Sequence, residues 1–287
     1  MKGTSRFAVG CPCLALVAAA ICAAPGAGAQ AGDLKASYAI TLAGFAVGEA
    51  SLTLAAAPAS YHTSLAMRLS GVAGQLTGAR GAAVSVGSIV GARPVPASYA
   101  ITTTNGRASR TVRILLQGGS VSGVEVKPPV DVVDDRVPVS AADKANVMDP
   151  ISALVMPMPR PDKPLDPSGC DRKLAVFDGV ARFDVTLSYA RTETVTINGY
   201  SGPALTCQAR YTPISGHRTS LKSTSFMAEN RDMQISLAPV DGSTLLFPVK
   251  ISVRTLFGML DIDATSLQPV AGNVQTKSLR AQAGASK

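Results

Sequence analysis

Hydrophobic and polar residues alternate along most of the chain. The alternation is strictest in residues 180–189, where every second residue from Arg182 to Ser188 is polar and the residues between them are apolar. Successive side chains of a strand point to opposite faces, so this period predicts strands with one buried and one wet face. About a dozen such stretches are present, at 38–42, 45–54, 61–69, 83–90, 97–104, 108–116, 121–126, 173–177, 180–189, 205–211, 232–237, 245–253 and 258–264.

Short turn signals separate these stretches. Asn105-Gly106 predicts a type I′ hairpin turn, because both residues tolerate the positive φ angles that this turn requires. Further reversals are indicated at Gly44, Gly118-Gly119, Asp178-Gly179 and Asn198-Gly199. Short turns between alternating strands predict a mainly β protein: an antiparallel meander that forms a barrel, a half-barrel or a large sandwich.

One short central helix is predicted over residues 149–156. Asp149 suits the N-cap, and Pro150 suits the first helical position. Spacing of i, i+3 and i+4 would place Ile151, Leu154 and Val155 on one apolar face. The proline-rich residues 156–167 end the helix and form either an ordered crossing loop or a domain linker.

The first 29 residues have the order of a secretory signal peptide. Lys2 and Arg6 precede an apolar run at 14–22, and a small-residue stretch follows. Cleavage after residues 27–29 would make Gln30 the first mature residue; a cut after 29–31 is a close rival. One alternative is that the segment is retained as a membrane anchor, although the apolar run is shorter than a membrane-spanning helix requires. The other is lipidation at Cys22. We expect a signal peptide at 1–29, a β-rich domain at 30–270 and a disordered tail at 271–287.

The cysteines agree with export. Three of the five lie in the signal segment, and only Cys170 and Cys207 lie beyond it. In the periplasm, an oxidising compartment, these two are expected to form a structural disulfide. The alternative is a redox pair, but the chain has no Cys-x-x-Cys motif to support it.

Composition narrows the function classes. Without residues 1–29 the chain keeps 25 basic and 19 acidic residues, a net charge of +6. The basic residues are scattered and have no interleaved aromatic run, which argues against a nucleic-acid partner. No later segment is apolar for long enough to span a membrane. The chain has no Trp, so its core must be mainly aliphatic.

Six short segments carry a family resemblance, at 38–50, 149–154, Cys170 with 176–179, 182–184, 200–207 and 211–217. In residues, order and spacing they resemble the DUF3108 family of exported bacterial proteins. The resemblance implies a periplasmic β-rich domain without an assigned activity, and it supplies no catalytic residues. It also suggests likeness to envelope proteins whose incomplete barrels hold lipid or lipoprotein partners, which is an analogy of fold.

Enzymatic signals are weak. His62 and His217 are the only histidines, and neither has further ligands at the spacing of a zinc site. No Gly-x-Ser-x-Gly elbow and no phosphate-binding glycine loop is present, so neither catalytic residues nor a cofactor is predicted. Arg182 and Asp184 would share one strand face. A solvated strand face explains these two better than a glycosidase-like carboxylate site does.

An apolar cavity is the remaining candidate site. A curved sheet with small side chains can enclose a lipid-sized ligand, and the central helix could act as its lid. The residues proposed to contact a ligand or form the lid are Met148, Ile151, Leu154, Val155, Met156 and His217. The alternative is that the methionines simply fill the core, since methionine is a common gap filler.

Three functions are therefore carried forward. The first is a non-enzymatic periplasmic envelope protein that binds a lipid or a protein partner. The second is a scaffolding protein of the envelope without a small ligand. The third is a hydrolase of envelope polymers, which requires His217 to lie within hydrogen-bond reach of a serine or carboxylate in a cleft.

Overall fold

The computed structural model describes residues 33–57, 59–240 and 242–269. The expected signal peptide at 1–29 and tail at 271–287 lie outside them. The first half holds β1 (Leu34–Leu42), β2 (Phe45–Ala57), β3 (Ser60–Leu69), β4 (Arg80–Val90), β5 (Arg93–Asn105), β6 (Ala108–Gln117) and β7 (Ser120–Lys127). The second half holds β8 (Met156–Pro157), β9 (Arg172–Phe177), β10 (Arg182–Ile197), β11 (Tyr200–Ser215), β12 (Met233–Pro239), β13 (Leu245–Thr255) and β14 (Gly258–Pro269). The mainly β fold class is confirmed.

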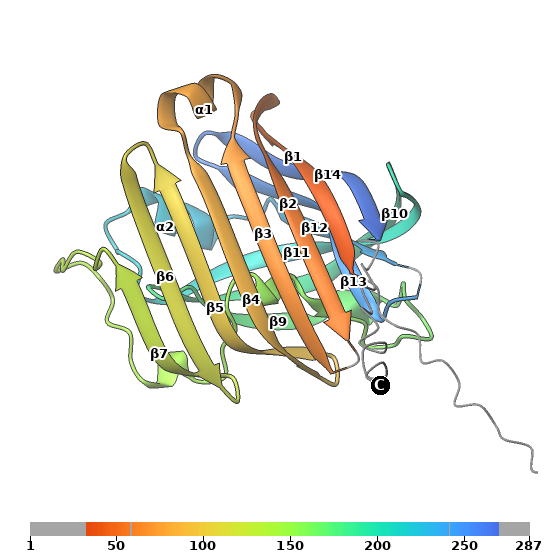
Figure 1. Cartoon of the computed structure of the whole chain (residues 1–287), viewed down its shortest axis with the longest axis horizontal. Helices are drawn as coiled ribbons and strands as arrows, with labels where there is room; N and C mark the ends of the chain where they lie inside the picture. Colours follow the sequence, from red (N-terminus) through yellow and green to blue (C-terminus); the bar gives the residue numbers. More distant parts are fainter. Residues whose placement is uncertain (1–32, 58, 241, 270–287) are drawn as a thin grey trace, which may run out of the picture.

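All fourteen strands belong to one antiparallel sheet. Its order is β7-β6-β5-β4-β3-β2-β1-β14-β13-β12-β11-β10-β9, with β8 paired to β13. The pairing of β1 with β14 joins the two halves, so both run outward as meanders from a shared centre. The sheet curls, and the strands of the second half lie behind and across those of the first (Figure 1). The result is a half-barrel with β7 and β9 at its two edges.

Residues between β7 and β9 close the gap at the β9 edge. The Val147 amide donates to the Gly119 carbonyl, 2.7 Å away, in the β6–β7 turn. The Met148 amide donates to the Ala175 carbonyl, and the Met148 carbonyl accepts from the Phe177 amide. This segment therefore connects the two halves of the curled sheet, and the chain then enters its interior.

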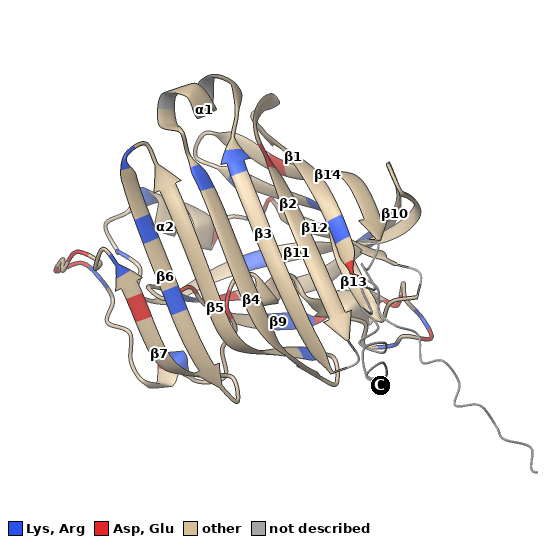
Figure 2. Cartoon of the chain, in the orientation of Figure 1, with Lys and Arg blue, Asp and Glu red and all other residues tan. Residues whose placement is uncertain are grey.

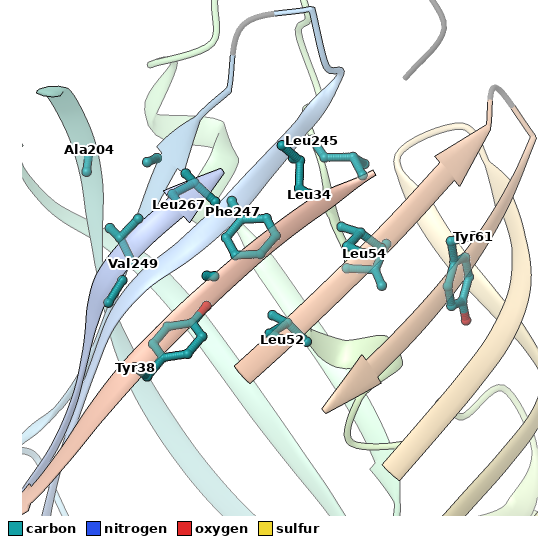
Figure 3. Close-up of a cluster of buried hydrophobic side chains, with 14 residues drawn as sticks. Leu34, Tyr38, Leu52, Leu54, Tyr61, Ala204, Leu245, Phe247, Val249 and Leu267 are labelled. Atoms are coloured by element: carbon teal, nitrogen blue, oxygen red, sulfur yellow. The ribbon is translucent and has the colours of Figure 1, made fainter. Parts of the chain in front are cut away.

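The interior is aliphatic, as the composition predicts. One buried cluster joins residues of β1 and β2 to residues of β11–β14, and Figure 3 shows Tyr38, Leu52 and Phe247 among them. A second cluster covers β9–β12, and a third lies under β4–β6. Burial of such side chains from both halves stabilises the curl, at about 25 cal/mol for each Å² of apolar surface removed from water.

The predicted central helix is present as one 3-10 turn, Ser152–Leu154. Val155 is already extended, with φ −81° and ψ 106°. Pro157 disfavours a helical conformation at Met156, and Met156 instead pairs with Leu246 of β13. The turn is therefore too short to present the predicted apolar helical face.

Two α-helices lie outside the strand pattern. They are α1 (Gly71–Thr77) and α2 (Lys222–Glu229). The first, α1, occupies most of the glycine-rich stretch 71–81. The sequence pattern does not predict α2, which contacts β11 and β13.

The turn at Asn105-Gly106 differs from the predicted type. Asn105 still belongs to β5 and pairs with Ala108 of β6, so the two loop residues are Gly106 and Arg107. Gly106 has φ +59°, whereas neither Asn105 nor Arg107 has a positive φ. A positive φ at the first loop residue alone is the pattern of a type II′ turn. The hairpin is confirmed, and the predicted type I′ turn is wrong.

The predicted disulfide is present. Cys170 ends the 3-10 turn Pro167–Cys170, and Cys207 lies on β11. Their Cα atoms are 5.4 Å apart, a usual separation for a disulfide, and both residues are fully buried in the second cluster. The bond ties the start of β9 to the middle of β11.

Candidate functional site: an apolar pocket under the central turn

An apolar pocket lies inside the second half of the sheet. Its volume is about 200 Å³, and strands β9–β13 form its walls together with the central turn. Of its fifteen lining residues, Gln234 alone is polar. A cavity with such a lining offers dispersion contacts and almost no hydrogen bonds, which suits an apolar group and not a sugar or a charged substrate.

The strand period places these side chains. On β10, Phe183, Val185 and Leu187 face the pocket and alternate with polar residues on the other face. Leu187 is buried, whereas Phe183 and Val185 are half-buried. On β13, both lining residues, Ile251 and Val253, are half-buried. The pocket therefore has a closed inner end and a more exposed rim.

The central turn forms one wall of the pocket. Pro150, Ala153, Leu154 and Met156 contribute to the lining. Leu154 and Met156 are thus the two predicted ligand contacts that the structure brings to the pocket. Because the turn enters from the gap between β7 and β9, it divides the pocket from the inner face of β3–β5.

The other predicted lid residues lie in different clusters. Met148 is buried in the cluster that surrounds the pocket but does not line it. Ile151 packs under β4–β6, and Val155 packs against β1 and β13. An extended segment points successive side chains in different directions, so these residues cannot share the face that a regular helix would give them. The expectation that they contact a ligand is corrected for these three.

A buried polar network holds the turn from its other side. Asp149 is fully buried, and its Oδ1 accepts hydrogen bonds from the amides of Ile151 and Ser152, at 3.0 and 2.9 Å. Its Oδ2 accepts from Ser85 Oγ at 2.8 Å and from Ser152 Oγ at 2.5 Å. Tyr61 Oη and Ser152 Oγ share a further hydrogen bond of 2.6 Å. Asp149 thus caps the turn, as its sequence position predicts, and also binds it to the sheet.

Burial changes the acidity of this network. It raises the pKa of Asp149 above the usual value, an effect that the hydrogen bonds from Ser152, Ser85 and Ile151 oppose. Burial also raises the pKa of Tyr61 to about 12. A tyrosine with this pKa remains a neutral hydrogen-bonding group near neutral pH, so Tyr61 acts as a fixed partner of the turn.

His217 lies away from the pocket. It follows the end of β11, where its carbonyl accepts from the amide of Val137. Its buried Nδ1 has no hydrogen-bond partner among the described residues. The contact that the hydrolase hypothesis requires of His217 is therefore not present in the described part of the chain, and its expected ligand contact is corrected.

Arg182 and Asp184 share one strand face, as predicted, and they form an ion pair there. Arg182 Nη2 lies 2.6 Å from Asp184 Oδ1, and Lys173 Nζ lies 3.1 Å from Oδ2. Asp184 is 7% exposed, not solvated as expected. Burial opposes its ionisation, but the two cations lower the pKa of Asp184 below its usual value. A carboxylate held in its ionised form is unsuited to the role of a general acid.

A larger hollow lies on the outer face of β1–β5. It measures about 730 Å³, and Ala66, Ala82 and other small residues line it beside the exposed Glu49–Arg68 ion pair. Lys and Arg on this side of the molecule are scattered over several strands (Figure 2). Exposed ion pairs contribute little, and nothing in this hollow converges on one point. The interior pocket is therefore the better candidate site.

The described residues offer neither a cluster of metal ligands nor a helix that could span a membrane. No group of three or more His, Cys, Asp or Glu side chains there could hold a metal ion. None of the described helices has the length and apolar character needed to cross a membrane.

The family model of the "Protein of unknown function (DUF3108)" matches residues 37–265. The chain belongs to this family. A comparison with curated proteins finds no match. Among solved structures, the chain resembles a "Beta-barrel-like Protein of Domain of Unknown Function DUF1849" from Brucella abortus. That likeness covers 83% of this chain and 98% of the other, with 10% sequence identity and a TM-score of 0.48.

Sequence reasoning missed most of this DUF3108 pocket. It identified Leu154 and Met156, but not the lining residues of β10 and β13. The alternation along β10 and β13 showed which face of the sheet is buried. No local sequence pattern showed which part of that face other side chains leave uncovered. It also missed Ser85 and Tyr61, because they meet Asp149 only across the curled sheet.

Proposed function

We propose that this chain is an exported, non-enzymatic envelope protein of the periplasm that binds the aliphatic chain of a lipid-like amphiphile. The single observation that carries the proposal is the interior pocket with its almost wholly apolar lining. Its closed inner end and exposed rim suit a chain that enters end-on and leaves a polar head outside. No charged side chain in the lining would be desolvated by such a ligand.

The volume limits the length of the chain. Small-molecule pockets usually measure about 300–1,000 Å³, and this one measures about 200 Å³. A group the size of a water molecule has a share of about 30 Å³ in a liquid. The pocket therefore has room for roughly seven methylene-sized groups. The proposed occupant is a short acyl or alkyl chain, or the end of a longer one.

We expect affinity to rise with chain length and then to level off. Each buried methylene contributes about 0.8 kcal/mol, which is about a fourfold change in Kd. Straight-chain carboxylic acids of four to fourteen carbons should therefore bind about fourfold more tightly per carbon. The rise should end at roughly seven buried carbons. Calorimetry of the purified protein, supported by native mass spectrometry, measures the series.

The chain offers a matched pair of variants for this test. Val185→Phe adds bulk at the pocket rim and should weaken every member of the series. Val84→Phe adds the same bulk at an exposed valine on the outer face of β4 and should leave binding unchanged. A wild-type protein whose Kd does not change with chain length would refute the proposal and favour the scaffolding function. Equal weakening by both variants would place binding elsewhere.

Export predicts a particular mature protein. The proposal is supported by the signal-like order of residues 1–29 and by the buried disulfide. Protein purified from the periplasm should begin at Gln30 and contain no free thiol. Intact mass and thiol titration under denaturing, non-reducing conditions measure both. A chain that keeps its first 29 residues, or one with two free thiols beyond them, would contradict export through a cleaved signal.

A further inference from the structure

The central turn has two chemically different sides. Ala153, Leu154 and Met156 face the apolar pocket, whereas Asp149 and Ser152 face the sheet. Nothing in the lining of an apolar pocket requires a buried carboxylate behind it. Burying a charged group is costly unless hydrogen bonds compensate. The network therefore calls for an explanation beyond packing.

Contacts from two strands hold the polar side. Ser85 of β4 reaches both Asp149 and Ser152, at 2.8 Å in each case, and Tyr61 of β3 reaches Ser152. All four side chains are at least 97% buried. Since water does not compete for these bonds, a displacement of the turn would leave several buried polar groups without partners.

We propose that Ser85, Tyr61 and Asp149 are specificity-determining residues, which limit the length of the bound chain by fixing the turn that forms one wall of the pocket. This inference rests on the proposed function of the pocket. An aliphatic chain longer than the pocket can be accommodated inside only if the turn moves. The turn moves only if its bonds to β3 and β4 break. The network thus stops the affinity from rising beyond the chain length that the pocket holds, and it leaves the binding of shorter chains unaffected.

The variants Ser85→Ala and Tyr61→Phe test this. Each removes bonds between the turn and the sheet but keeps the amide bonds that cap the turn at Asp149. A hydrogen bond contributes about 1 kcal/mol, which corresponds to about a fivefold change in Kd. Carboxylic acids longer than the wild-type limit should bind about fivefold more tightly to either variant. Shorter acids should keep their wild-type Kd within about twofold.

Ser236→Ala is the matched control. Ser236 is also a buried serine that donates to a carboxylate, Glu193 Oε1 at 2.9 Å, but it does not contact the turn. The control should lose a similar amount of stability and keep the wild-type length limit. Loss of stability alone therefore cannot produce the expected shift. Amide hydrogen exchange at Val155 should be faster in the two test variants than in the control.

The outcomes separate the two proposals. A wild-type series without length dependence overturns the proposed function, and this inference with it. A wild-type series that levels off, with the same limit in folded Ser85→Ala and Tyr61→Phe, overturns this inference alone. Far-UV circular dichroism establishes folding. If Ser85→Ala does not fold, the milder Tyr61→Phe decides, since it keeps the ring and removes one hydroxyl.

Discussion

Replacement of both Cys170 and Cys207 by alanine is expected to lower the free energy of unfolding by about 4 kcal/mol. The disulfide closes a loop of 37 residues. In the chain-entropy account, the bond restricts the unfolded chain, and a loop of this length corresponds to about 4 kcal/mol. That is a large part of the 5–15 kcal/mol that usually stabilises a domain, so the variant should be close to unfolding at 37 °C.

Urea unfolding of oxidised wild type and of the double variant measures the difference. The wild type with its disulfide reduced is the control, because it keeps the buried sulfur atoms and lacks only the covalent bond. We expect the reduced wild type to lose most of the same free energy. Suppose that reduction leaves the unfolding midpoint of the wild type unchanged while the double alanine variant has a lower midpoint. The buried sulfur atoms would then stabilise the fold through packing in the second cluster, and loop closure would contribute nothing.

Gly199→Ala is expected to destabilise the protein by about 3–4 kcal/mol. Gly199 lies at the tip of the β10–β11 hairpin, with φ +84°, and a Cβ there would be 2.1 Å from the Leu267 carbonyl oxygen of β14. Next to it, the Asn198 amide donates to Thr265, and the Leu267 amide donates to the Asn198 carbonyl. An alanine would add about 1–2 kcal/mol of backbone strain and would break these two bonds, which contribute about 1 kcal/mol each.

Gly44→Ala is the matched control for the hairpin tip. Gly44 has φ +83°, nearly the same φ angle as Gly199, but a Cβ there would meet nothing within 4 Å. It should show the strain alone, so the two variants should differ by about 2 kcal/mol. Thermal and urea unfolding, with both variants side by side, measure this difference. Equal losses would mean that the contact between the hairpin tip and β14 contributes nothing.

Much of the fold follows from the local pattern. Period-two alternation identifies strands because the pleat itself has a period of two, and each turn glycine marks a reversal that few other residues allow. The 3-10 turn shows the limit of such reasoning. The i, i+3, i+4 spacing of Ile151, Leu154 and Val155 is helical, but the prolines that follow and the pairing with β13 extend the chain. Tertiary pairing overrides a short helical pattern.

The candidate site was less predictable. The disulfide could be inferred from two cysteines and an expected oxidising compartment, and Leu154 and Met156 from their place on the predicted central helix. The pocket itself depends on how completely side chains from β9–β13 fill the space beneath the turn, and that depends on volumes that no single segment contains. His217, which the sequence suggested as a ligand contact, follows the end of β11 and does not line the pocket.

By itself, the sequence determined that this is a mainly β protein built from antiparallel hairpins, with two cysteines able to form one disulfide beyond the signal-like segment. These properties depend on residues near one another in the chain or on simple counts. Only the tertiary structure decided that β1 pairs with β14, that the sheet curls around residues 147–156, and that Asp149 meets Ser85 and Tyr61. Those contacts join residues far apart in the chain. Their formation depends on the shape of the whole sheet, which local alternation does not specify.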